Sequence, residues 1–344
     1  MRLAVSPPLP PMLAKRVDQL PAGTTWVFEP KWDGFRALVF RDGDDVTIQS
    51  RDQKCLNRFF PELLEPIRSQ LPKQCVLDGE IVIYGKKGLE FESLQLRLHP
   101  AASRVRHLSE TIPASLVFFD LLCEGSGDFR NDPFSKRRRR LESLLASARP
   151  PIHVTPATRD RSTALDWFQR FEGAGLDGVI AKDVESVYQP DKRVMLKIKH
   201  ERDCDCVVAG FRWYRTGRSR VGSLLLGLFD ESGSLHHVGV CSSFTDKARR
   251  DLVTKLSPYR KNAVATATKP GMPSRWSQGK DLSWEPLRPE LVVEVAYDHM
   301  QGERFRHIAQ FRRWRPDKLP RACTFDQLDV VVAQELKEIF GSNG

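Results

Sequence analysis

Lys31 is the residue whose type and setting best suit chemistry, as a nitrogen nucleophile. It lies in the segment Glu29-Pro30-Lys31-Trp32-Asp33-Gly34-Phe35-Arg36. A lysine attacks a phosphorus or carbonyl centre only as the free amine, which burial or neighbouring cations favour over the ammonium. Asp33-Gly34 permits a tight turn that presents a side chain to a cleft, and Arg36 offers a planar set of donors to a phosphate or ribose. A lone lysine is more often a solvated surface group, so this interpretation needs support from elsewhere in the chain.

Further motifs follow Lys31 in a defined order. They are Ser50-Arg51, Leu77-Asp78-Gly79-Glu80, Val117-Phe118-Phe119-Asp120, Leu176-Asp177-Gly178-Val179-Ile180-Ala181-Lys182 and Met195-Leu196-Lys197-Ile198-Lys199. Lys197 and Lys199 alternate at the period of a strand, so both are expected to face one side. Glu80 and Asp177 carry hard oxygen donors suited to Mg²⁺, although such carboxylates are often surface groups or members of ion pairs.

The ordered set resembles the covalent nucleotidyltransferase superfamily, which contains DNA ligases, RNA ligases and mRNA capping enzymes. The similarity runs from about residue 7 to about residue 320, and six motifs in order are far more specific than any one of them. The resemblance implies that Lys31 takes AMP from ATP onto its ε-nitrogen and releases pyrophosphate. AMP would then pass to the 5′-phosphate of a nick, and the 3′-OH would attack that phosphate. Mg²⁺, with Mn²⁺ as an alternative, would serve each step.

The same resemblance implies a set of nucleotide contacts. The set comprises Glu29, Lys31, Arg36, Arg51, Glu80, Phe119, Lys182, Lys197, Lys199 and Arg306. Glu29 would read the adenine edge, and Phe119 would stack on the base while Phe118 points into the core. Glu80 and Asp177 would hold the metal. The family more often has Glu at the latter position, so the shorter Asp177 is expected to reach the metal through water.

Within the assigned set, Arg36 and Arg51 would lie by the ribose and later by the 5′-phosphate of the nick. Lys197 and Lys199 would neutralise the α-phosphate with help from Lys182.

The last motif points to the DNA-ligase branch. The segment 311–318 is basic and ends in Asp317-Lys318, and it resembles the segment that orients departing pyrophosphate in DNA ligases. The usual Arg-x-Pro upstream of it is replaced by Arg306-His307-Ile308. In detail the chain is similar to short bacterial ATP-dependent ligases of the ligase C type, which work in DNA repair. An RNA ligase or capping-type enzyme, and a non-catalytic OB-fold protein that binds nucleic acid, are the alternatives.

The elements that must position these residues indicate an α+β fold. Strands are expected on both sides of the Asp42-Gly43 turn, and helices over 60–71, 133–148 with Ser135 as N-cap, and 163–175. The resemblance implies a nucleotidyltransferase domain of ATP-grasp-like antiparallel sheets with helices over 1–202. An OB-fold barrel with the C-terminal motif and tail would occupy 203–344, with a hinge near 200–205. A long loop is expected over 262–284 and a terminal helix over 326–340.

Composition agrees with a protein that acts on a polyanion. Among 344 residues, Lys and Arg exceed Asp and Glu by 54 − 44 = 10, and the pI is about 9.3. Candidate contacts to the phosphate backbone are Lys136–Arg140, the arginines Arg212, Arg215, Arg218 and Arg220, and the 262–284 loop. Seven scattered cysteines, no signal peptide and no long apolar stretch predict a cytoplasmic protein without membrane contact. The resemblance to DNA ligases implies association with the nucleoid. Nicked duplex DNA is the expected partner of a monomer, together with a separately encoded repair polymerase.

Overall fold

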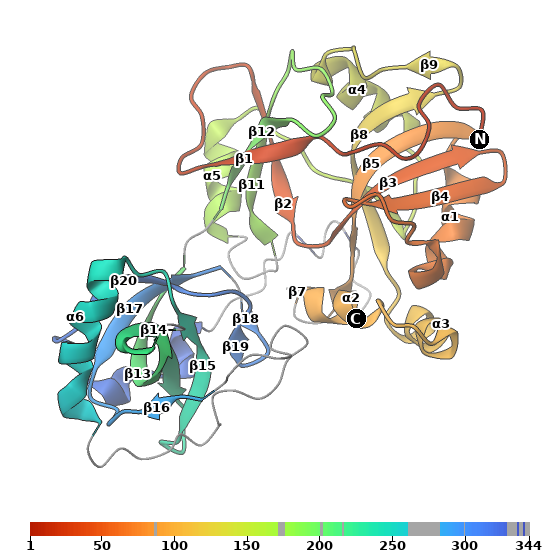
Figure 1. Cartoon of the computed structure of the whole chain (residues 1–344). Helices are drawn as coiled ribbons and strands as arrows, with labels where there is room; N and C mark the ends of the chain where they lie inside the picture. The colour runs from red at the N-terminus through yellow and green to blue at the C-terminus, as the bar shows by residue number, and fades with distance from the viewer. Residues whose placement is uncertain are drawn as a thin grey trace. The chain divides into compact units, whose positions relative to one another are not determined.

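The chain forms two compact units in the computed structural model (Figure 1). The structure describes residues 1–85, 88–170, 176–199, 202–214, 217–260, 283–298 and 300–328, together with Leu336 and Phe340. One unit comprises Met1–His200 with Val330–Gly344, and the other comprises Glu201–Asp329. The sequence predicted that all of residues 203–344 belong to the second domain. In the structure, residues 330–344 instead group with the first unit. The reason is hydrophobic burial, since Leu336 and Phe340 pack among its core residues.

A six-stranded sheet forms the larger half of the first unit. Its order is β10-β8-β5-β3-β4, with β9 added to β8. The strands are β3 (Phe35–Asp42), β4 (Asp45–Ser50), β5 (Gln74–Val82), β8 (Ser115–Glu124), β9 (Gly127–Asp128) and β10 (Ile152–Val154). The expected turn between β3 and β4 is present, and Gly43 adopts a positive φ of 64° in it. Alternation along β3 and β5 separates two apolar faces, one of which packs against α1 (Leu64–Gln70) and α4 (Phe134–Leu144).

A four-stranded sheet completes the first unit, in the order β1-β12-β11-β2. Its strands are β1 (Leu13–Val17), β2 (Trp26–Trp32), β11 (Leu176–Asp183) and β12 (Arg193–Ile198). The helix α5 (Arg161–Arg170) packs against β2 and β11 through Ala164. The sequence predicted this helix over 163–175, and residues 171–175 lie outside the part of the chain that the structure describes. The strand β2 carries Lys31 and β11 carries Asp177, so this sheet places both beside each other.

Some elements of the first unit were not expected from the sequence. They are β1, the helices α2 (Phe91–Leu96) and α3 (Ala102–Thr111), the strand β7 (Gly88–Leu89) that pairs with β6 (Tyr84–Gly85), and the 3₁₀ turn η1 (Asn57–Phe59). They are short or half-exposed, which weakens the apolar periodicity that identifies helices and strands. The 3₁₀ turn η2 (Pro61–Leu63) lies inside the helix predicted over 60–71. The prediction of Ser135 as N-cap was wrong. The N-cap of α4 is Pro133, and the backbone nitrogen of Ser135 donates to the carbonyl of Val184.

The second unit is built on a six-stranded antiparallel sheet, in the order β15-β14-β13-β17-β20 with β16 paired to β13. The strands are β13 (Arg202–Tyr214), β14 (Gly217–Phe229), β15 (Leu235–Cys241), β16 (Glu285–Pro286), β17 (Val292–Tyr297) and β20 (Gln310–Trp314). A bridge between Cys241 and Ala309 joins the end of β15 to the start of β20. The sheet thereby closes on itself, as an OB-fold barrel requires.

Smaller elements complete the second unit. They are α6 (Asp246–Leu256), the pair β18 (Met300–Gln301) and β19 (Arg304–Phe305), and the 3₁₀ turns η3 (Ser257–Tyr259), η4 (Pro320–Ala322) and η5 (Phe325–Leu328). Leu252 and Leu256 of α6 are buried in the barrel core. The predicted loop over 262–284 and most of the predicted terminal helix lie outside the described residues.

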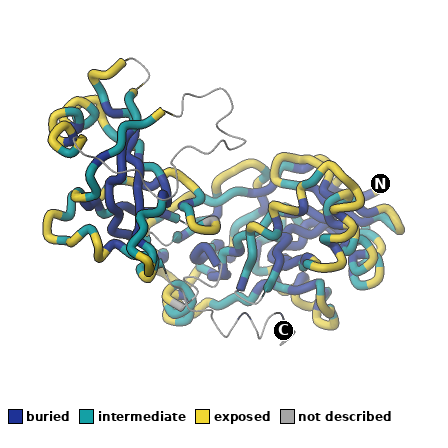
Figure 2. Tube along the Cα trace, turned by 90° about the horizontal axis from the view of Figure 1, so that it is seen from below, coloured by how far each residue is buried: buried dark blue, intermediate teal, exposed yellow. Residues whose placement is uncertain are grey.

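The α+β class and the OB-fold barrel agree with the prediction. Within each unit the buried stretches of the chain run through the interior and the exposed stretches lie at the periphery (Figure 2). No helix in the part of the chain that the structure describes has the length and apolar character needed to cross a membrane.

Candidate active site

A cavity of about 650 Å³ opens in the first unit, and Lys31 lies in its wall. Of the predicted nucleotide-binding residues, the lining includes Glu29, Lys31, Arg36, Arg51, Glu80, Phe119, Lys182 and Lys197. These residues come from both sheets and from the turn after β4. Lys199 is connected to the cavity through its ion pair with Asp177, which Lys31 shares. Arg306 belongs to the second unit, between β19 and β20.

Asp177 holds two of the lysines. Its Oδ2 atom lies 2.6 Å from Nζ of Lys31 and 2.6 Å from Nζ of Lys199. The carboxylate is 6% exposed, so the ion pairs are screened little by water. Lys31 on β2 is therefore oriented by a residue of the neighbouring strand β11.

A β-bulge explains why Asp177 reaches Lys31. Leu176 pairs with Trp32 and Val179 pairs with Pro30, so β11 contains one extra residue in this interval. Gly178 supplies the necessary backbone conformation, with φ at +119°. A Cβ at this position would also collide with the carbonyl oxygen of Ile198 on β12. The Asp177-Gly178 pair thus needs glycine for both its conformation and its close packing.

Three lysines surround this single carboxylate. Burial lowers the pKa of Lys197, and the ammonium groups of Lys199 and Lys31 lower it further. Asp177 opposes that effect but cannot balance three positive charges. A group of cations with excess positive charge favours an anionic ligand, and phosphate oxygens suit it.

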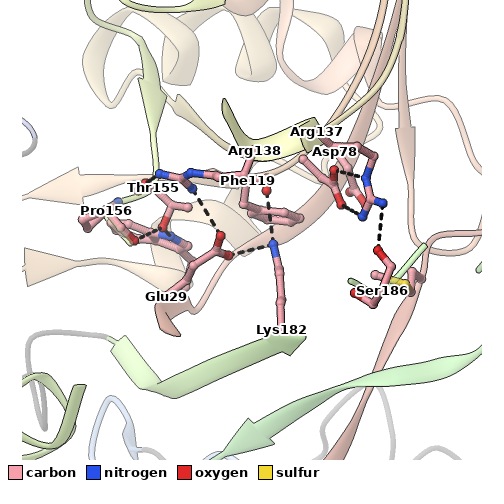
Figure 3. A network of polar contacts seen from close by, with 12 residues as sticks. Glu29, Asp78, Phe119, Arg137, Arg138, Thr155, Pro156, Lys182 and Ser186 are labelled. Atoms are coloured by element: carbon pink, nitrogen blue, oxygen red, sulfur yellow. Dashed lines mark hydrogen bonds and ion pairs between the residues drawn. The ribbon is translucent and has the colours of Figure 1, made fainter. Parts of the chain in front are cut away.

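Glu29 connects a second set of cations at the cavity wall (Figure 3). Its carboxylate lies 2.7 Å from Nζ of Lys182 and 3.2 Å from Arg138. Lys182 also donates to the carbonyl oxygen of Phe119 at 3.1 Å. Burial lowers the pKa of Lys182, and the charge of Glu29 partly opposes this. The carboxylate of Glu29 therefore positions Lys182 and Arg138, a role that the sequence did not indicate.

Phe119 presents its ring to the cavity, while Phe118 is fully buried against the helix-covered face of the sheet. This confirms the expected division between the two neighbouring phenylalanines. The guanidinium of Arg36 and the ammonium of Lys182 each lie 4.6 Å from the centre of the Phe119 ring. Cation–π contacts of this kind help to hold the two side chains beside the ring.

Asp78 and Tyr188 support Arg36. Both oxygens of Asp78 accept from Arg36 at 2.6 Å, and the Tyr188 hydroxyl donates to Asp78 at 2.7 Å. Asp78 is part of the sequence motif, but the sequence analysis gave it no role. Its position two residues before Glu80 on β5 puts both side chains on one face of the strand, and this was the signal available. Tyr188 lies in a loop 110 residues further along, and no local pattern indicated it.

Glu80 lies opposite Arg36 on the neighbouring strand β5. Burial raises the pKa of Glu80 to about 7, while Arg36 and Lys31 act in the opposite direction. A carboxylate whose charge is disfavoured by burial gains from a divalent cation, so Glu80 fits a Mg²⁺ ligand. Asp177 is already neutralised by two lysines, and it fits a metal only after one of these ion pairs is released. The described residues contain no cluster of three or more His, Cys, Asp or Glu side chains, so phosphate and water would supply the other ligands.

Comparison with known proteins identifies the family. A family model described as the ATP dependent DNA ligase domain matches residues 11–199, more than half of the chain. A second model, the ATP dependent DNA ligase C terminal region, matches residues 217–318. The chain belongs to the ATP-dependent DNA ligase family.

Two mycobacterial DNA ligases are similar in sequence to this ligase over nearly its whole length. DNA ligase C2 of Mycolicibacterium smegmatis is 54% identical over 343 residues, covering 96% of each chain. DNA ligase C of Mycobacterium tuberculosis is 52% identical over 355 residues, covering 98% of this chain and 99% of the relative. A solved structure of a Lig E DNA ligase is 17% identical, covers 89% of this chain and 99% of its own, and has a TM-score of 0.54. That likeness shows a shared fold. The ligase is thus similar to the bacterial ligase C type over both units.

Two of the five residues in the basic run Lys136–Arg140 of the ligase are buried, so they are not available to the expected phosphate-binding face. Arg137 is buried and forms a bidentate ion pair with Asp120 at 2.8 and 2.9 Å. Arg138 is also buried and contacts Glu29. Lys136 pairs with Asp132, and Arg140 pairs with Glu124. The helical period turns two of these residues into the core, which a count of charges does not reveal.

The other basic candidates lie in the second unit. Arg220 forms an ion pair with Asp246, and Arg215 lies outside the described residues. In the last motif, Arg315 contacts Asp205, Glu294 and Asp317, and Lys318 lies 3.5 Å from Asp205. The cations of this motif are therefore paired with carboxylates of the same unit. A polyphosphate would have to exchange with these partners to bind there.

Proposed function

We propose that this ligase seals nicks with a 3′-OH and a 5′-phosphate in duplex DNA, using Lys31 as the nucleophile that carries AMP. The observation that carries the proposal is the position of Lys31 Nζ, which lies in the cavity wall 2.6 Å from Asp177 Oδ2. Lys197 and Lys199 lie with it, so the nucleophile and the cations that accept phosphate charge belong to one cluster.

In the first step, Lys31 attacks the α-phosphate of ATP. The N–P bond forms, the bond from phosphorus to the bridging oxygen breaks, and pyrophosphate leaves. The ammonium of Lys31 must lose its proton before attack, and Asp177 Oδ2 is within hydrogen-bond reach to accept it. Lys197 and Lys199 stabilise the negative charge that develops on the phosphoryl oxygens.

The base and sugar are held by the opposite wall. Phe119 offers its ring to adenine, and Arg36, held by Asp78, offers donors to the ribose. Glu29 lies on β2 two residues before Lys31 and lines the same cavity. Its backbone can contact the base edge, since its carboxylate is engaged by Lys182. Arg51 is exposed at the cavity and reaches toward incoming phosphate.

In the second step, an oxygen of the 5′-phosphate attacks the AMP phosphorus and the N–P bond to Lys31 breaks. In the third step, the 3′-OH attacks the 5′-phosphate and AMP leaves as the phosphodiester forms. Mg²⁺ bound at Glu80, with Asp177 as a second ligand, would supply charge neutralisation on the phosphoryl oxygens. Arg36 and Arg51 would orient the DNA phosphate in the cavity.

The remaining assignments are also proposals. The unit of Met1–His200 with Val330–Gly344 is the adenylation domain, and the unit of Glu201–Asp329 is the OB-fold domain. Arg306 and the last motif serve pyrophosphate release. The enzyme acts in DNA repair as a monomer near the nucleoid, beside a separately encoded polymerase, and it accepts Mn²⁺ in place of Mg²⁺. The basic balance of the chain supports contact with DNA phosphates.

Labelling of the protein with ³²P from the α-position of ATP tests the central step. The wild-type enzyme with Mg²⁺ is expected to form an acid-stable protein–AMP adduct, whereas Lys31→Ala forms none. Lys54→Ala is the matched control, because Lys54 lines the same cavity. It is expected to label like the wild type. Labelled GTP is expected to give no adduct, which separates a ligase from a capping enzyme.

Nick sealing on a duplex with one labelled 5′-phosphate tests the later steps. The wild type is expected to seal the DNA nick in preference to the same nick in RNA. An unlabelled wild type, or equal labelling of Lys31→Ala, contradicts the proposed nucleophile. Labelling without sealing of either substrate contradicts the ligase activity alone.

A further inference from the structure

A small apolar cluster adjoins the proposed active site, and Trp32 belongs to both the cluster and the cavity lining. Its buried members in the strands are Trp32, Val82, Val117 and Leu176. Trp32 follows Lys31, and Leu176 precedes Asp177. Val82 and Val117 lie two residues from Glu80 and Phe119, and thus on the same strand faces as those residues. We call these four side chains the floor cluster. Both sheets contribute to it, so its packing fixes the spacing between the residues that face the cavity.

Two residues from the end of the chain complete the floor cluster. Leu336 is fully buried and Phe340 is 7% exposed. The Phe340 ring meets Trp32 edge-on, with ring centres 5.9 Å apart at 88°. It also stacks on Tyr84 at 4.8 Å and 15°, and contacts His153 at 4.9 Å. A residue that follows the whole barrel in sequence thus packs against the residue next to Lys31.

Trp32 is held at two points. Its indole Nε1 donates to the Thr155 hydroxyl at 2.9 Å, and its ring packs nearly perpendicular to the ring of Phe340. Trp32 also pairs with Leu176 at the start of the bulge that aims Asp177 at Lys31. Removal of the Phe340 ring would leave a void beside Trp32, and the surrounding side chains would relax into it. Such relaxation displaces the backbone of both Lys31 and Asp177.

We propose that Phe340 is a positioning residue for the lysine nucleophile, acting through Trp32, and that Leu336 and Phe340 are in this way a functional part of the adenylation site. The proposal rests on the assignment of Lys31 as the residue that carries AMP. It adds a distant residue to the site, since Phe340 does not line the cavity. A displacement of a reacting group by about 1 Å can cost about 100-fold in rate, so a partial displacement is expected to cost about tenfold.

The rate of lysyl–AMP formation in single-turnover experiments tests this. In the full chain, Phe340→Ala is expected to lower the rate constant at saturating ATP about tenfold. The ATP concentration for half-maximal rate is expected to change less than about twofold, because Phe340 is not among the residues that line the nucleotide cavity. Phe340→Leu, which keeps most of the volume, is expected to recover most of the rate. Phe129→Ala is the matched control, because Phe129 packs against the helix-covered core of the same unit. It is expected to leave the rate unchanged.

A double-mutant cycle separates positioning from general loss of structure. If Phe340 acts through Trp32, the Trp32→Ala/Phe340→Ala double variant is no slower than Trp32→Ala alone. The proposal is overturned if the double variant is slowed by the product of the two single-variant factors. It is also overturned if Phe340→Ala forms lysyl–AMP at the wild-type rate. Circular dichroism gives the folded fraction by which each rate is divided, so a variant that is partly unfolded is still scored. Failure of Lys31→Ala to abolish labelling is a separate result and contradicts the proposed function instead.

Discussion

Lys31 Nζ and Asp177 Oδ2 lie 2.6 Å apart, and Lys199 contacts the same carboxylate oxygen. One acid on β11 thus orients the proposed nucleophile and a phosphate-binding cation together. In the proposed mechanism, adenylylation removes the charge of Lys31, so the lysyl–AMP form lacks this ion pair. The carboxylate then keeps its ion pair with Lys199 and can accept another cation.

Removal of the Asp177 charge is expected to stop the first step. Asp177→Asn keeps the size of the side chain but cannot accept a proton from Lys31 or hold both ammonium groups. Lysyl–AMP formation should fall about 100-fold or more, as measured by labelling with ATP. Asp177→Glu keeps the charge and should retain more activity than Asp177→Asn. Equal activity of the two variants would show that the charge is not needed.

Gly178 is expected to tolerate no side chain. Gly178→Ala combines a positive φ with a collision at the Ile198 carbonyl, so it should destabilise the first unit and disrupt the bulge. Gly23 has a similar φ of +105°, but a Cβ there meets open space. Gly23→Ala should therefore cost about 1 kcal/mol and leave labelling intact. Thermal unfolding and the labelling rate of both variants are the measurements, and a harmless Gly178→Ala would refute this account of the bulge.

Arg137 is expected to matter for stability and not for DNA binding. Arg137→Met leaves Asp120 buried without its bidentate partner, which should cost about 3–5 kcal/mol in the free energy of unfolding. Arg139→Met changes an exposed neighbour and should cost less than about 0.5 kcal/mol. Denaturant unfolding measures both. The salt dependence of DNA binding should be the same for Arg137→Met and the wild type at temperatures where both are folded, and a reduced slope would mean that Arg137 contacts phosphate.

His237 is expected to make the barrel unit less stable in mild acid. Burial, followed by the charge of Arg304, lowers its pKa to about 4 from an ordinary 6.5. Between pH 6.5 and pH 4, His237 is therefore protonated in the unfolded chain and neutral in the folded chain. The free energy of unfolding has its full value above pH 6.5 and decreases as the pH falls toward 4. The decrease is about 2 kcal/mol between pH 7.5 and pH 5. His237→Gln should remove this part of the pH dependence. Unfolding of the two proteins at both pH values is the measurement, and parallel curves would contradict the assignment to His237.

The sequence by itself determined the local part of this protein. The position of Lys31 where a strand meets a turn, Glu80 on a strand, and the opposite orientations of Phe118 and Phe119 all follow from motif content and the two-residue period of strands. The change from a mixed domain to a barrel near residue 200 was visible in the same way. Such features depend on neighbours within about ten residues, so a single chain segment contains the information.

Only the tertiary structure decided which of these groups meet. The sequence analysis assigned Asp177 as a metal ligand. In the structure, the bulge at Gly178 places Asp177 in ion pairs with two lysines. Arg137 and Arg138 appeared as a surface charge run, yet their carboxylate partners on β8 and β2 draw them into the core. Phe340 had no visible link to Lys31, from which it is separated by the whole barrel sequence. Contacts over such separations arise from complementary burial and charge between elements that are distant in the chain, and no local period encodes them.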